Sequence, residues 1–92
     1  MDDKDKIFLV FYVGLNHILQ EDRPAYFNEI VQFFINAFDE TIKPILIPDV
    51  TSDKTKVECI NPKLITEAEY CDVQELIDKS DKIIKKLKDY EQ

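Results

Sequence analysis

The sequence has little of the residues on which most catalytic and ligand-binding motifs depend. Among 92 residues there are one glycine, one histidine, two cysteines and no tryptophan. A single glycine excludes the glycine-rich loops that bind phosphate groups. One histidine and two separated cysteines do not give the spacing of zinc ligands, and no calcium-binding loop pattern is present. The sequence therefore predicts no cofactor and no metal site.

Histidine is also too scarce for the usual nucleophilic sites. A histidine base would have to be His17, and no serine or cysteine lies near it in the sequence. Pro48-Asp49 followed by Glu58 is similar to the pattern of metal-dependent nucleases, but Ile60 stands where that chemistry needs a lysine. A single loop histidine is typical of a solvent-facing residue. We therefore predict that the chain is not an enzyme and has no catalytic residues.

Lysine and arginine are also few relative to aspartate and glutamate. Nineteen acidic against twelve basic side chains give a formal net charge of −7. Nucleic acids and anionic membranes attract surfaces rich in lysine and arginine, so neither is the expected partner. The longest apolar run, residues 7–13, is too short to span a bilayer, and the acidic residues before it do not fit a signal peptide. Cys59 and Cys71 fit reduced thiols, which predicts a cytoplasmic protein.

Hydrophobic periodicity predicts one domain over residues 1–92, an α+β fold with a three-stranded sheet and two helices in the order β-α-β-β-α. Residues 7–13 form an unbroken apolar run, typical of a strand buried on both faces and ended by Gly14. A helix is expected from about Asp22 to Phe38. Its apolar residues cover more than the roughly 100° arc that a surface helix needs.

Two further strands and a second helix follow. Residues 41–47 predict an edge strand because Pro44 cannot donate a ladder hydrogen bond, and residues 55–60 alternate like a half-exposed strand. The two strands are close enough in sequence to form a hairpin with a long loop. Thr66 and Glu69 predict a capping box that starts a helix ending near Tyr90.

The order of the strands admits two solutions. The preferred one places the third strand in the centre, antiparallel to both neighbours, because Pro44 suits an edge. The alternation of the third strand and the two-faced apolarity of the first instead favour the first strand in the centre.

An excess of apolar surface predicts protein–protein contact. If both helices pack on one face of the sheet, the other face exposes Phe8, Val10 and Tyr12, a patch on the scale of contact sites. We therefore predict a non-enzymatic interaction or structural protein that forms a homo-oligomer. The interface candidates lie on the two helices: Tyr26, Phe33, Ala37, Leu76, Ile83 and Tyr90. The contrary arrangement, with one helix on each face, would hide the strand.

Three alternatives stay open. The last helix is acidic in its front half and basic in its rear half, which either stabilises the helix or orders an antiparallel contact between two copies. The chain can also be an acidic inhibitor that blocks a nucleic-acid-binding site on a host protein through Glu69, Asp72 and Glu75. A small metal-dependent hydrolase is the weakest of the three.

One segment carries a resemblance to a protein family. Ile47-Pro48, then Val57-Glu58-Cys59-Ile60 and Asn61-Pro62, are similar to a strand–loop–"VECINP" pattern in small uncharacterised proteins of tailed bacteriophages. The pattern covers about a quarter of the chain, and Lys56 stands where arginine is expected. The resemblance implies a phage-encoded virion component or accessory factor, located in the host cytoplasm or in the virion.

Overall fold

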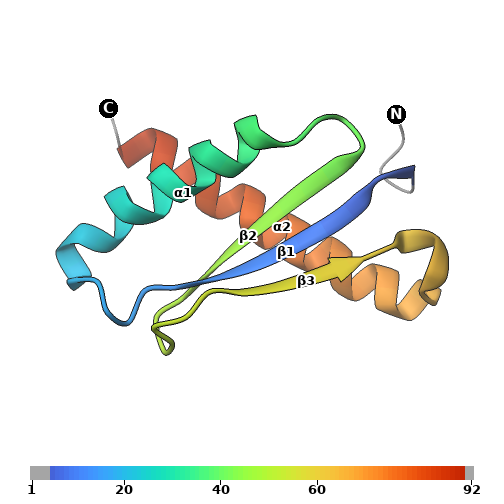
Figure 1. Ribbon diagram of the computed structural model, residues 1–92, viewed down its shortest axis with the longest axis horizontal. Helices are drawn as coiled ribbons and strands as arrows, with labels where there is room; N and C mark the ends of the chain where they lie inside the picture. The colour runs from blue at the N-terminus through green and yellow to red at the C-terminus, as the bar shows by residue number, and fades with distance from the viewer. Residues whose placement is uncertain (1–4, 91–92) are drawn as a thin grey trace.

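The computed structural model describes residues 5–90, with the side chains of residues 5–86 (Figure 1). It confirms the α+β fold and the order β-α-β-β-α. The strands are β1 (Ile7–Gly14), β2 (Ile42–Asp49) and β3 (Lys56–Ile60), and the helices are α1 (Arg23–Ala37) and α2 (Glu67–Tyr90). Two short 3-10 helices, η2 (Gln20–Asp22) and η3 (Pro62–Leu64), precede α1 and α2.

Strand β1 lies in the centre of the sheet, whose order is β2-β1-β3. It pairs in parallel with β2 and antiparallel with β3. The preferred sequence prediction, with the third strand in the centre, is therefore wrong, and so is the predicted β2–β3 hairpin. The alternative is correct, because β1, whose residues 7–13 are all apolar, takes the only position that has a neighbouring strand on each side. Pro44 does lie in an edge strand, β2, as predicted.

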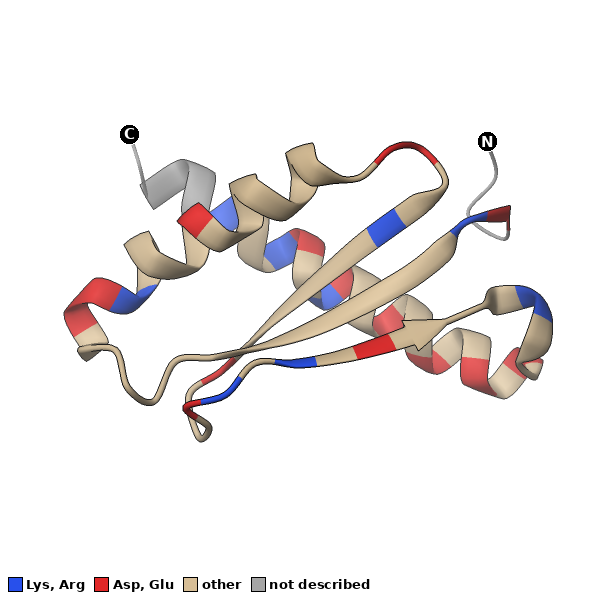
Figure 2. Cartoon of the chain, viewed as in Figure 1, with Lys and Arg blue, Asp and Glu red and all other residues tan. Residues whose placement is uncertain are grey.

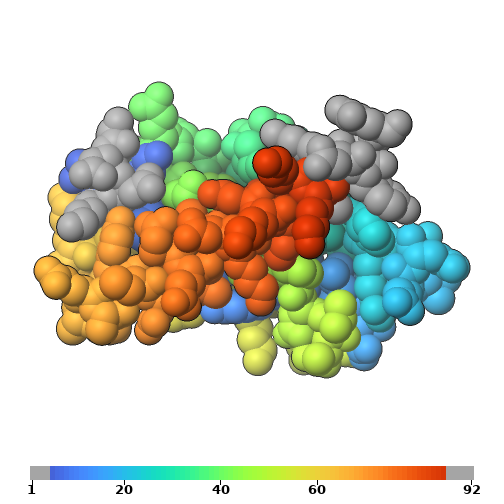
Figure 3. Space-filling model, turned by 180° about the vertical axis from the view of Figure 1, so that it is seen from behind, coloured from blue at the N-terminus to red at the C-terminus, as the bar shows by residue number. Residues whose placement is uncertain are grey.

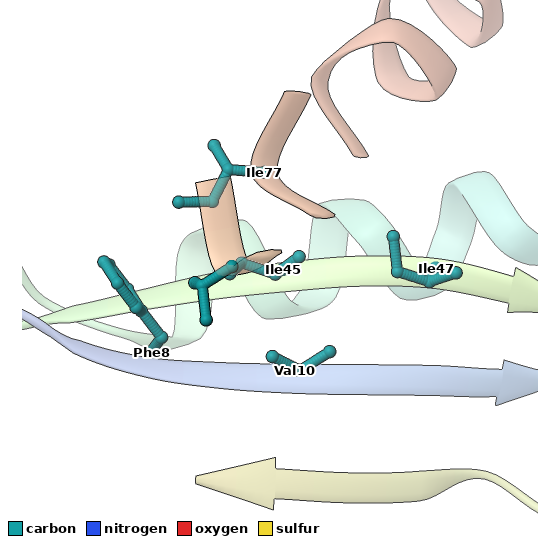
Figure 4. Close-up of a cluster of buried hydrophobic side chains, with 6 residues drawn as sticks. Phe8, Val10, Ile45, Ile47 and Ile77 are labelled. Atoms are coloured by element: carbon teal, nitrogen blue, oxygen red, sulfur yellow. The ribbon is translucent and has the colours of Figure 1, made fainter. Parts of the chain in front are cut away.

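Helix α2 covers one face of the sheet. Phe8 and Val10 of β1 and Ile45 of β2 pack against Val73 and Ile77 of α2, and all five side chains are buried. Figure 4 shows Phe8, Val10, Ile45 and Ile47 projecting from the strands on the side where Ile77 lies. Seen from behind, α2 runs across the sheet as one continuous layer (Figure 3).

Helix α1 covers the opposite face. Phe11 and Val13 of β1 and Leu46 of β2 pack against Phe27 and Val31 of α1. Both faces of β1 are thus shielded, and Phe8 and Val10 are 0% exposed. The expected patch on β1 does not exist, because the two helices take opposite faces and the central strand needs no partner molecule to bury it.

The predicted capping box begins α2. The backbone N–H of Glu69 donates to Thr66 Oγ1 at 3.1 Å, and the backbone N–H of Thr66 donates to Glu69 Oε1 at 3.2 Å. Each side chain satisfies a backbone donor that the first turn leaves without a partner. The asparagine of the Asn61-Pro62 pair caps η3 in the same way, by accepting the N–H of Lys63 at 3.0 Å. These local signals fix where α2 starts.

The outer edge of β2 is sealed by the chain itself. Ile7 N–H donates to Thr41 O, so odd-numbered residues of β2 point their backbone groups at β1 and even-numbered residues point them outward. Of the four outward positions, Pro44 and Pro48 have no N–H, and Ile42 N–H donates to Asp39 O. The fourth, Leu46 N–H, donates to Ser80 Oγ of α2 at 3.1 Å. No free donor remains on this edge.

We expect Ser80→Ala to lower the free energy of unfolding by about 1–3 kcal/mol, although it makes the helix seam more apolar. Ser80 is 3% exposed, so its loss leaves Leu46 N–H without an acceptor and shielded from water. Urea denaturation measures the difference, and Lys79→Ala, at the exposed neighbouring position, is the control with an expected change within about 0.5 kcal/mol. Equal stabilities of the two variants would contradict the role given to Ser80.

Candidate interaction surface

The edge formed by β3 is open, in contrast to the edge formed by β2. Even-numbered residues of β1 point their backbone groups toward β3, so the hydrogen-bonded pairs are Phe8–Ile60, Val10–Glu58 and Tyr12–Lys56. The intervening residues, Val57 and Cys59, therefore direct their N–H and C=O groups out of the sheet. Within the described part of the chain, no hydrogen bond satisfies these groups. An edge of this kind is a template for pairing with another strand.

The side chains of β3 are as exposed as its backbone. Val57, opposite Phe11 on the α1 face, is 58% exposed, and Cys59 on the same face is exposed. Leu9, the neighbour of Cys59 on β1, is only half-buried. Figure 1 shows the reason: α1 lies toward the β2 side of the sheet, and no helix lies in front of β3.

The α1 residues that border this uncovered region are apolar too. Phe33 is 67% exposed and Ala37, one turn later, is exposed. The ring of Phe33 lies 5.2 Å from that of Phe34, which stacks at 4.2 Å on Phe11, the residue opposite Val57. Phe33 and Val57 thus flank the same aromatic stack.

Geometry of the helix places Phe33 on the side of α1 toward β3. Ile35 lines a hollow with Pro44 of β2 and Ile84 of α2, so its flank of the helix faces β2. Phe33 is two positions earlier, about 200° around the helix, and so lies on the opposite flank. We use the name open face for the region formed by Leu9, Phe33, Ala37, Val57 and Cys59.

A groove adjoins β3 on the other side of the sheet. It has a volume of about 530 Å³ and is lined by β3, η3 and the first half of α2. Ile60, Ile65, Val73 and Leu76 supply apolar lining. The acidic side chains among its lining residues are Glu58, Glu69 and Asp72. The groove therefore suits a segment that combines apolar and basic side chains.

Glu58 also affects the pKa of a neighbouring side chain, Tyr12, on the α2 face of the sheet. The pKa of the Tyr12 phenol is raised above its usual value, first by burial and then by the negative charge of Glu58. Both residues point toward α2, because Tyr12 pairs with Lys56 and Glu58 pairs with Val10 on that face. On the short strand β3, Lys56 and Glu58 thus share the α2 face. Figure 2 shows that β3 carries one basic and one acidic residue.

The six predicted interface residues fall in different environments. Phe33 and Ala37 are exposed on the open face, as an interface requires. Tyr26 and Ile83 are half-buried against the core on the α1 face, and Leu76 is half-buried against the core on the α2 face. Tyr90 lies outside the residues whose side chains are described. The structure therefore brings two of the six together at one exposed site.

Other predicted features have clear positions. His17 is exposed and lies edge-on to the ring of Tyr26 at 6.0 Å. Both cysteines are free and exposed. Of the acids predicted for an inhibitor, Glu69 and Asp72 line the groove, whereas Glu75 is exposed outside its lining.

No group of three or more His, Cys, Asp or Glu side chains is placed to hold a metal ion in residues 5–86. No helix in the described part of the chain is long and apolar enough to cross a membrane.

Sequence reasoning missed β3 as a contact surface. A strand was correctly predicted here, but the expected burial of one face is wrong, because Lys56 to Cys59 are all exposed, and the preferred order placed the strand in the centre. The signal that identifies the edge is the charge of the strand, since Lys56 and Glu58 flank Val57 and charged residues are common on edges.

No protein-family model, curated protein sequence or solved structure matches this chain. The resemblance of residues 47–62 to phage-encoded proteins therefore stays a prediction.

Proposed function

We propose that this chain is a non-enzymatic interaction protein that acts by associating with further copies of itself. The observation that carries the proposal is the open edge of β3, where Val57 is 58% exposed beside unpaired backbone groups. The open face adds Phe33, so exposed apolar side chains and free hydrogen-bonding groups occur at one site. Burial of such a site against a partner removes apolar area from water and satisfies the backbone at the same time.

The contrast between the two sheet edges supports this proposal. Two prolines and two internal hydrogen bonds close β2, including one that uses a buried serine of α2. Native proteins protect their edges in this manner to prevent unwanted pairing. Strand β3 has neither a proline nor a helix in front of its α1 face, so its outward backbone groups stay accessible to a partner.

The biological setting follows from the resemblance and the composition. We place the protein in the cytoplasm of a host cell or in a virion, as a phage-encoded structural component or accessory factor. Its partners are proteins, and its net charge of −7 disfavours nucleic acid and anionic membranes as direct partners.

Phe33→Asp tests the self-association. The substitution puts a carboxylate into apolar surface that the contact would bury, so we expect the assembly to dissociate while the circular dichroism stays near wild type. Light scattering measures the mass and circular dichroism measures the fold. Ile35→Asp is the matched control, because Ile35 is an exposed apolar residue on the opposite flank of the same helix. We expect this control to remain associated.

Two outcomes would contradict this assignment. If Phe33→Asp unfolds the domain, Phe33 belongs to the core. If Phe33→Asp has the same mass as wild type, its flank of α1 is not part of the contact.

A second candidate function is favoured by the acidic lining of the groove, where Glu58, Glu69 and Asp72 come together beside Leu76. These carboxylates fit an inhibitor that occupies the basic, nucleic-acid-binding site of a host protein. Binding to such a site would weaken steeply as salt is added, because exposed charges are screened. Self-association of two chains of net charge −7 would not weaken steeply, because added salt also screens the repulsion between the chains, so a salt titration separates the two functions.

A further inference from the structure

We infer that two copies of this chain pair edge to edge through β3, antiparallel and centred on Val57, so that two three-stranded sheets become one six-stranded sheet. The inference rests on the proposed self-association and specifies its geometry. The occupant of the open edge is a second copy of the same strand, placed by a two-fold axis that passes through the contact.

The backbone of β3 is ready for this contact. Val57 and Cys59 point their N–H and C=O groups away from β1, and no described residue satisfies them. In an antiparallel pair centred on Val57, the two Val57 residues face each other and exchange both hydrogen bonds. Thr55 of each copy then faces Cys59 of the other copy. The free groups of the edge find partners without any change in the fold.

Charge selects this register. Centring on Val57 places Lys56 of each copy directly opposite Glu58 of the other, on the α2 face. These are non-hydrogen-bonded pairs, in which the side chains of antiparallel strands approach most closely. Each contact therefore gains two opposite-charge pairs, which stabilise antiparallel strands. The sequence Lys56-Val57-Glu58 is complementary to itself only when it runs antiparallel.

The neighbouring registers are excluded by the same residues. Moving the centre to Glu58 places two glutamates opposite each other, and moving it to Lys56 does the same with two lysines. Like charges directly opposite destabilise a strand pair.

The surroundings of β3 fit the second copy on both faces. On the α1 face, the two exposed Val57 side chains cover each other and join the two open faces. On the α2 face, the second strand brings its Lys56 beside Glu58 and its Lys54 beside Ile60. Both positions line the groove that also holds Glu69 and Asp72. The groove suits a segment with basic and apolar side chains, and β3 of the second copy supplies such a segment beside it.

Charge reversal tests the pairing. Lys56→Glu alone should weaken association, since both cross-strand pairs become glutamate opposite glutamate, and Glu58→Lys alone should do the same through lysine. The dissociation constant of each variant, measured by analytical ultracentrifugation, should rise roughly ten-fold or more. An equal mixture of the two variants should recover wild-type affinity, because each strand then meets its complement. The double variant K56E/E58K should also recover it.

The control uses the same charges on a different element. Glu75→Lys and Lys79→Glu reverse exposed residues of α2, and we expect neither to change the dissociation constant. If the two α2 variants weaken association and the two β3 variants do not, the protein associates through α2 instead of β3. Circular dichroism of each variant identifies any that fails to fold, and the mixture and the double variant then decide the question.

The outcomes separate the two proposals. If wild type associates and the single β3 variants associate equally well, the pairing is overturned while self-association stands. If the single variants weaken and their mixture does not recover, the register centred on Val57 is wrong. If wild type is a monomer at every concentration, self-association and this pairing both fail.

Discussion

Phe8→Ala should lower the free energy of unfolding by about 3–5 kcal/mol, which is a large part of the stability of a domain of this size. Phe8 is 0% exposed and packs with Ile45 and Ile77 between the sheet and α2, with its ring 6.5 Å from that of Tyr70. Truncation removes the apolar contacts and leaves a cavity that the central strand cannot close, because β1 is held by a neighbour on each side. Urea denaturation of the dilute monomer measures the effect.

Phe33→Ala is the matched control for Phe8→Ala. The same ring is removed from a position that is 67% exposed in the single chain, so the expected change in the free energy of unfolding is below about 1 kcal/mol. Similar losses at Phe8 and Phe33 would contradict the division between a core strand face and an exposed helix flank.

Gly14→Ala should destabilise the fold by about 1–3 kcal/mol or more. A Cβ atom on Gly14 would lie 2.5 Å from the carbonyl oxygen of Lys54, and 2.7 Å from both the carbonyl carbon and the nitrogen of that residue. Backbone atoms cannot move aside as the end of a side chain can, so β1 would have to separate from the loop before β3. That separation would also break the hydrogen bond from Gly14 N–H to Thr55 Oγ1, which is 3.2 Å long.

Lys54→Ala is the control for Gly14→Ala. It shortens the side chain of Lys54, whose backbone lies against Gly14, and leaves that backbone unchanged. We expect it to change stability by no more than about 0.5 kcal/mol. Thermal melting of both variants decides the matter: a Gly14→Ala protein as stable as Lys54→Ala would show that the close approach has no energetic consequence. The sequence predicts that Gly14 ends the first strand, and it is the last residue of β1, with a φ that is not positive. Glycine is required at this position because the backbone of Lys54 leaves no room for a side chain.

The elements of the fold were predictable because their signals are local. The apolar run of residues 7–13 requires cover on both faces, and the capping box at Thr66 and Glu69 forms as its spacing predicts. The bounds differ from the predicted ones by a residue or two at the ends of the strands. The residues next to each other in the sequence determine where a helix or strand begins, so these starting points can be predicted without knowledge of distant contacts.

The arrangement of the elements was less predictable because it depends on distant contacts. The choice between β1 and β3 as the central strand depends on which faces the helices cover, and no local pattern states that. Ser80 gave no sign of its role in the helix seam, because its partner, Leu46 N–H, is 34 residues away. Leu76 and Ile83 are half-buried for a similar reason, because they pack against core residues that are distant in the sequence.

The open face was half predictable. Phe33 and Ala37 were identified from the width of the apolar arc of α1, and both are exposed. Val57 was not identified, because its exposure depends on the position of α1 over the β2 side of the sheet (Figure 1). That position follows from the stacking of Phe34 on Phe11 and from the contact of Ile83 and Ile84 of α2 with the same cluster.

The mass of the wild-type protein in solution, measured by light scattering across a range of concentration, tests the central claim most directly. The open edge of β3 predicts a mass that rises from that of the 10.8 kDa chain to at least twice that value at micromolar concentration. A mass that stays at the single-chain value throughout, together with β3 amide protons that exchange as fast at high concentration as at low, would contradict it.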